Sequence, residues 1–132
     1  MALSITSWAN SVQYRTIYES NLTNSVNTYV TGSPGVVTMI IFDNSEGSAA
    51  NYLKVHDGYT ATSGQTEPTI RLRASAGEKL VVNMPTGIFF EKGVCFWGTA
   101  SASTADNTTP AVNANGTAKV TIVASSRGKG DY

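Results

Sequence analysis

The sequence predicts an all-β fold, an antiparallel β-sandwich of about eight or nine short strands. Apolar and polar residues alternate over short segments, turn residues separate these segments, and no stretch keeps a helical period. Strand-favouring Val, Ile, Thr and Tyr are frequent, whereas helix-favouring Leu, Glu and Lys are scarce. The pattern is typical of a jelly-roll-like sandwich, with an immunoglobulin-like sandwich as the alternative.

Alternating or continuous apolar runs bounded by turns give the expected strands. They are Val12–Tyr18, Asn27–Thr31, Val36–Phe42, Tyr52–His56, Thr69–Ala74, Lys79–Asn83, Ile88–Glu91, Val94–Ser101 and Thr117–Ala124. The most apolar run, Val36–Phe42, is rich in β-branched residues and predicts a strand buried on both faces. In Tyr52–His56 we expect Leu53 and Val55 to face the core and Lys54 to face outward.

Turn chemistry predicts the connections between these strands. Ser75–Glu78 reads as a tight turn, and Met84–Gly87 is expected to close the strand that precedes it. The small, polar segment Ala102–Gly116 must be a surface loop, because a buried loop would leave backbone groups without partners.

A chain of 132 residues suits one domain, so residues 1–132 are expected to form a single sandwich. A short N-terminal arm (about residues 1–10), which includes the alternating segment Leu3–Trp8, would precede the strands, and a flexible C-terminal tail (about residues 126–132) would follow them. The start lacks the pattern of a signal peptide, and no apolar run approaches the ~18 residues of a membrane span. We therefore expect a soluble protein made in the cytosol, with no membrane partner.

The charge of the chain is sparse and balanced, with nine basic residues, nine acidic residues and one His. A neutral chain has no long-range field that would steer nucleic acid or an anionic membrane toward it. We therefore expect no nucleic-acid partner. Cys95 is the only cysteine, which excludes an intrachain disulfide, and its apolar neighbours predict a buried, inert thiol.

Few residues could carry out chemistry. His56 beside Asp57 could serve a distant Ser as a base, but the following Gly58 makes a strand end and a turn the simpler interpretation. The cluster Asp43–Glu46 offers oxygen ligands without the spacing of a calcium loop, and one Cys with one His cannot build a zinc site. We expect no catalytic residue, no cofactor-binding residue and no metal site, and hence no enzyme.

Aromatic side chains could form a platform on which a sugar stacks, although most aromatics in a sandwich pack in the core or across strands. The candidates are Trp8, Tyr14, Tyr18, Tyr29, Tyr52, Tyr59 and Trp97.

An ordered series of motifs runs from residue 51 to about residue 123. The motifs are Asn51–Gly58, Gln65–Leu72, Ala76–Leu80, Met84–Val94 and Ala105–Pro110. This series resembles a group of small virion proteins of tailed phages, which share a YLKLY strand, a TxP loop, a PAG turn, a PxGxxFxxG segment and an ADxTxP loop in this order. Here Ala76-Gly77 stands where the group has Pro-Ala-Gly.

The resemblance implies a structural virion protein, most often a capsid decoration or cement protein, that binds and stabilises the head shell as a symmetric oligomer. Its partners would be the major capsid protein, or another virion protein, and further copies of itself in a dimer or trimer. It would be located in the virion, which is assembled in the host cytoplasm, and the N-terminal arm and C-terminal tail are expected to reach the shell. A tail or neck component and a glycan-binding, lectin-like or adhesin-like module are the alternatives. The resemblance brings no catalytic residues.

Overall fold

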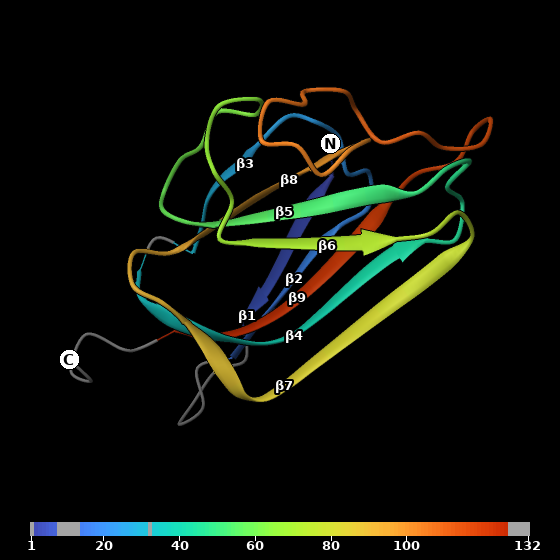
Figure 1. Cartoon of the computed structure of the whole chain (residues 1–132). Helices are drawn as coiled ribbons and strands as arrows, with labels where there is room; N and C mark the ends of the chain where they lie inside the picture. Colours follow the sequence, from blue (N-terminus) through green and yellow to red (C-terminus); the bar gives the residue numbers. More distant parts are fainter. Residues whose placement is uncertain (1, 8–13, 32, 127–132) are drawn as a thin grey trace.

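The computed structural model describes residues 2–7, 14–31 and 33–126 of the chain. Within this part there are nine strands and no helix, and the strands form two antiparallel sheets that pack face to face (Figure 1). The all-β sandwich expected from the sequence is therefore confirmed. The strands are β1 (Leu3–Ser7), β2 (Tyr14–Glu19), β3 (Asn27–Thr31), β4 (Gly35–Asn44), β5 (Asn51–Asp57), β6 (Ile70–Ala74), β7 (Glu78–Phe90), β8 (Val94–Thr99) and β9 (Lys119–Ser126).

The strand order identifies the jelly-roll form of the sandwich. One sheet has the order β1-β2-β9-β4-β7 and the other β3-β8-β5-β6. From β2 to β9, the first strand pairs with the last, the second with the last but one, and so on inward: β2 with β9, β3 with β8, β4 with β7 and β5 with β6. This is the pairing of one long hairpin whose turn lies between β5 and β6. Two further pairs, β4 with β9 and β5 with β8, close the rolled hairpin into two sheets. This nested pairing is that of a jelly roll.

Alternate residues of both sheets fill the core between them. Ile17, Phe42, Leu53, Phe96 and Ile122 are completely buried there. Figure 1 shows the two sheets as layers, with β5, β6 and β8 above β2, β4, β7 and β9, and the buried side chains lie between these layers. Because side chains alternate across a strand, the outer faces are covered only where a loop crosses them.

The strand buried on both faces is not the one expected from the sequence. In β4, which contains Val36–Phe42, buried residues alternate with half-buried ones, so that expectation is wrong for the outer face. In β8 all six residues are buried. The difference arises because the loop that follows β8 crosses the outer face of the four-stranded sheet, where Lys54 bonds to Ser103 and Arg71 bonds to Ala102.

The segment Met84–Gly87 does not form the expected turn. It is a large, irregular bulge within a single strand, β7, which has 13 residues. Asn83 lies opposite Met39 and Ile88 lies opposite Val37, so four residues of β7 face one residue of β4. Pro85 and Gly87, which has a φ of 74°, are compatible with a bulge as well as with a turn. The segment forms a bulge because β7 pairs with the same strand, β4, on both sides of it.

Lys54 lies on the outer face of β5, opposite the core-facing Leu53 and Val55, as the alternation predicts. It is nevertheless buried, because the loop that contains Ser103 covers it. Of the expected N-terminal arm, residues 3–7 form the edge strand β1 in register with β2, from Leu3 opposite Glu19 to Ser7 opposite Arg15. Residues 8–10 of the arm lie outside the described residues, and so does the tail beyond residue 126.

Removal of a core ring should destabilise the fold far more than removal of an exposed one. Phe42 is completely buried, so Phe42→Ala is expected to lower the free energy of unfolding by about 3–5 kcal/mol. Phe89 has half of its surface exposed (51%), so Phe89→Ala should cost about 1 kcal/mol or less. Urea denaturation of both variants measures the difference, and equal losses would contradict this placement of the core.

Candidate contact surface

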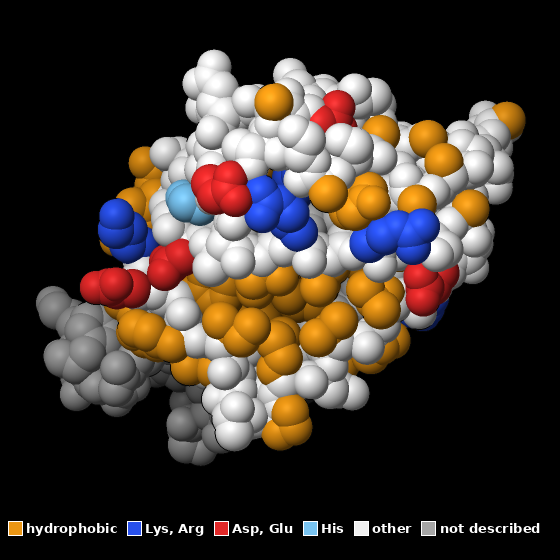
Figure 2. Space-filling model, viewed as in Figure 1, with side chains coloured by type: hydrophobic (Ala, Val, Ile, Leu, Met, Phe, Trp, Pro, Cys, Tyr) orange, Lys and Arg blue, Asp and Glu red, His pale blue; other side chains and the backbone are white. Residues whose placement is uncertain are grey.

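The open side of the sandwich exposes a continuous band of apolar side chains. β6 and β7 are the edge strands of their sheets, and each pairs with a neighbour on one side only. Most of their core-facing side chains are half-buried, with Ala74 and Phe90 at the strand ends fully buried, and Figure 2 shows hydrophobic atoms gathered between the two strands. We call this band the β6–β7 surface; its residues are Ile70, Leu72, Leu80, Val82, Met84 and Ile88.

β7 is apolar on its outer face as well. Val81 and Phe89 point to that side, and each has about half of its surface exposed (50% and 51%). A long edge strand also presents backbone groups that other chains can pair with. An apolar band beside such an edge is the usual signature of a protein–protein contact site.

The other edge of the five-stranded sheet exposes apolar side chains for the same geometric reason. In β1, Ile5 lies opposite the buried Ile17 and Leu3 lies opposite the buried Glu19. Nevertheless Leu3 and Ile5 are 38% and 43% exposed. The four-stranded sheet therefore does not extend over β1, and the core-facing side of this strand remains accessible.

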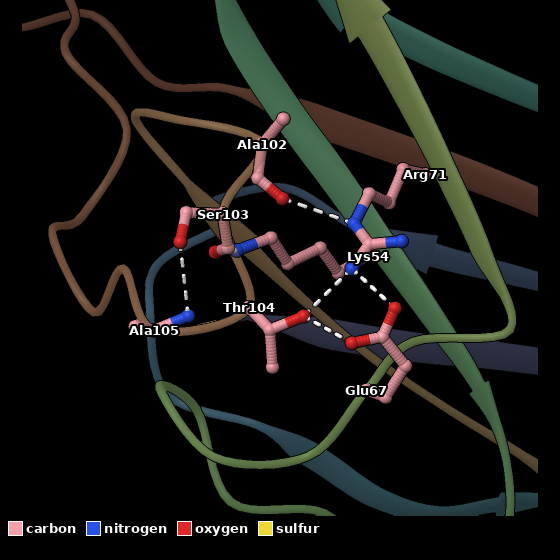
Figure 3. Close-up of polar contacts among 7 residues, drawn as sticks. All are labelled: Lys54, Glu67, Arg71, Ala102, Ser103, Thr104 and Ala105. Carbon is pink, nitrogen blue, oxygen red and sulfur yellow. Dashed lines mark hydrogen bonds and ion pairs between the residues drawn. The ribbon is translucent and has the colours of Figure 1, made fainter.

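A buried lysine attaches the loop after β8 to the four-stranded sheet. Lys54 Nζ donates a 2.6 Å hydrogen bond to the carbonyl oxygen of Ser103. Arg71 donates to the carbonyl of Ala102 at 2.9 Å and to Thr104 Oγ1 at 2.6 Å, and it pairs with Glu67 at 2.6 Å. Figure 3 shows these side chains converging on residues 102–105. Burial lowers the pKa of Lys54, against the opposing charge of Asp106.

Two buried asparagines fix the other end of the sandwich. Asn44 Nδ2 donates to the carbonyls of Ala74 (3.2 Å) and Ser75 (2.9 Å), which end β6. Asn51 Nδ2 donates to Asn44 Oδ1 and to the carbonyl of Ala111, both at 2.8 Å, and Asn51 Oδ1 accepts from the Ala111 amide at 2.9 Å. The pair thus connects β4, β5, β6 and the long loop through satisfied buried hydrogen bonds.

His56 and Asp57, which the sequence allows but does not favour as a catalytic pair, make separate contacts in the structure. Both oxygens of Asp57 accept backbone N–H bonds, from Glu91 and Lys92 at 2.9 Å and from Gly93 at 3.4 Å. His56 Nδ1 is buried and has no hydrogen-bond partner in the described part of the chain. Burial tends to raise the pKa of Asp57, but the three N–H donors outweigh it and the pKa lies below its usual value.

The other chemically capable residues are engaged in structural contacts. Cys95 is buried as expected, and burial, with the charge of Asp57, raises the pKa of its thiol to about 11. Asp43 accepts from the Ser45 amide at 3.0 Å, and Glu46 pairs with Lys119. No group of three or more His, Cys, Asp or Glu side chains that could hold a metal ion occurs among the residues described.

Of the seven aromatic candidates, the structure brings two together on the surface. Tyr29 and Tyr59 stack, with ring centroids 5.8 Å apart. Trp97 is buried, Tyr52 is half-buried, and Tyr18 lines a separate shallow cleft of about 160 Å³ beside Lys79 and Lys119. Trp8 and the side chain of Tyr14 lie outside the described residues.

Comparison of the chain with protein-family models, with curated proteins and with solved structures finds no match. In the described residues there is no helix of the length and apolarity that crossing a membrane requires.

Asp57 should contribute to stability as a carboxylate that receives backbone donors. Its pKa is lower in the folded chain than the ordinary 3.8, so its contribution is complete above that value and is lost as the pH falls through the folded pKa. We expect Asp57→Asn to lower the free energy of unfolding by about 1–2 kcal/mol at neutral pH and to reduce the further loss in acid. Urea unfolding at neutral and acid pH tests this, and identical acid dependence in both proteins would contradict it.

Proposed function

We propose that this protein is a structural component of a tailed-phage virion, a capsid decoration protein that binds the head shell as a symmetric oligomer. The observation that carries the proposal is the β6–β7 surface, an apolar band between two edge strands of a sandwich with no net charge. Its support from the sequence is the motif series from residue 51 to about residue 123, which includes most of β6 and β7.

The bonding of the loops fits a role in contact rather than reaction. A protein that reinforces a shell must keep its shape, and here the long loops are attached through Lys54, Arg71, Asn44 and Asn51. Two of the side chains that could perform catalysis have structural partners: Asp57 holds the connection between β7 and β8, and Glu46 holds β9, while His56 Nδ1 is buried without a partner among the described residues. We therefore propose a binding protein without catalytic activity.

The two exposed edges of the five-stranded sheet suit an assembly with more than one contact per chain. β7 offers the β6–β7 surface, and β1, at the opposite edge, offers Leu3 and Ile5. One edge can meet a shell subunit while the other meets a second copy. Contacts made simultaneously raise the overall affinity well above that of each single contact.

Co-sedimentation with capsids that lack decoration is the direct test of the proposed function. The purified chain is mixed with such capsids, the particles are pelleted, and bound protein is measured against the number of capsid subunits. We expect saturation at a fixed ratio and a higher melting temperature of the decorated shell. Absence of co-sedimentation would contradict decoration and would favour the tail or neck position.

A charge placed in the β6–β7 surface should weaken this association. Met84 is half-buried in the band, so Met84→Glu would bury a carboxylate at the contact, and we expect capsid binding to fall about tenfold or more. The matched control is Val123→Glu, which places the same charge at a half-buried position of the central strand β9. Loss of binding in the control and not in Met84→Glu would show that this is not the contact surface.

A further inference from the structure

Two tyrosines form an exposed aromatic platform that the proposed function does not use. Tyr29 belongs to β3, and Tyr59 lies just after β5, in the loop that Figure 1 shows beside β3. Their rings are nearly parallel, with an interplanar angle of 6° and centroids 5.8 Å apart. The Tyr29 amide donates to the Tyr59 carbonyl at 2.7 Å, so the backbone holds the two rings in place.

The backbone at Tyr29 is unfavourable and is not offset by burial of the ring. Its φ of 52° lies in the left-handed region, which non-glycine residues rarely adopt. The ring is 63% exposed, the largest exposed fraction among the exposed large apolar side chains described. The neighbouring Asn27, Val30 and Thr31 are buried, and they hold the strand on both sides of this residue. A strained residue that presents an exposed ring is characteristic of a binding site.

The surroundings of the platform select the chemical class of its ligand. The segments 27–31 and 58–66 contain no charged residue, and Thr28, Thr60 and Thr62 are exposed beside the rings in sequence. Charged residues adjoin these segments: Asp57 and Glu67 flank residues 58–66, and the Gly58 amide donates to the carbonyl of Gly93, the neighbour of Lys92. Bases of single-stranded nucleic acid stack on aromatic rings beside several cations that neutralise phosphate, whereas Lys92 is a single cation with acidic neighbours. A neutral pyranose ring needs no cation, because its C–H face packs on the electron-rich ring face and its hydroxyls bond to neutral polar groups.

We propose that the Tyr29–Tyr59 platform binds the pyranose ring of a neutral saccharide. The ring packs on an outer face of the tyrosine pair, and threonine hydroxyls at the margin bond to the sugar hydroxyls. An open platform gives weak binding at a single site. Many copies of the chain on one particle would add these weak contacts into avid binding to a surface that carries glycans.

Neutral mono- and oligosaccharides of glucose, galactose and mannose are the probes for this site. Saturation-transfer NMR with the full chain detects contact with each sugar, and an array of neutral glycans gives the preference. We expect saccharide binding that falls about tenfold or more in Tyr29→Ala and in Tyr59→Ala. Tyr29→Phe and Tyr59→Trp keep the stack and should retain binding.

Tyr18→Ala is the matched control, because Tyr18 is also partly exposed (38%) but lines the separate cleft with Lys79 and Lys119. Its saccharide binding should equal that of the unmodified protein. Circular dichroism melting verifies that each variant folds, and Tyr59→Ala avoids the strained backbone position. Absence of binding to every neutral saccharide would overturn the proposal, as would equal loss in Tyr18→Ala.

A third outcome identifies a protein contact instead of a sugar. If Tyr29→Ala and Tyr59→Ala reduce co-sedimentation with capsids and no saccharide binds, the platform is part of the shell interface and the saccharide proposal is wrong. Capsid binding and saccharide binding are measured separately, so failure of this inference does not depend on failure of the proposed function.

Discussion

The structure depends on one constraint, the closure of a long hairpin onto itself into two sheets of unequal width. The pairs β2 with β9, β3 with β8, β4 with β7 and β5 with β6 are nested, so each sheet is built from both halves of the chain. The addition of β1 makes one sheet wider than the other. The extra strand leaves the core-facing side of β1 without a facing strand, and at the opposite edge β6 and β7 have no neighbour that would cover their side chains.

Buried polar side chains complete the fold where apolar packing ends. Lys54 bonds to Ser103, and Asn51 bonds to Ala111, so the loop after β8 is attached to the four-stranded sheet at two points. Glu19 is completely buried and accepts bonds from the amides of Ala2 and Asn21 and from Asn27 Nδ2. A buried carboxyl group that accepts several hydrogen bonds fixes the position of the backbone that it meets. The polar residues thus set where the loops lie, and the apolar residues set where the sheets lie.

The sequence was sufficient for the fold class and for most strands, because both depend on local alternation. Asn27–Thr31 was located to the residue, and the positions of Leu53 and Val55 were correct. The errors concern the burial of Lys54, Met84–Gly87 and the outer face of Val36–Phe42, and each depends on a distant segment. Lys54 is buried by a loop that lies about fifty residues away in sequence, since the bond to Ser103 spans 49 positions. The local pattern of apolar and polar residues contains no information about a distant loop that will bury a residue.

The candidate surfaces were even harder to predict from the sequence than the buried positions, for a related physical reason. Leu80 and Val82 alternate like any core residues, and only the missing partner beyond β7 leaves them half-buried. Tyr29 and Tyr59 lie thirty residues apart and become neighbours because β3 and the loop after β5 meet through the Tyr29 amide. Both surfaces therefore arise where the nested pairing ends or is interrupted: β7 has no further strand beside it, and the register between β3 and β8 shifts between Asn27 and Thr31. In a jelly roll, regular pairing supplies stability, and the interruptions of that pairing supply the groups that can bind other molecules.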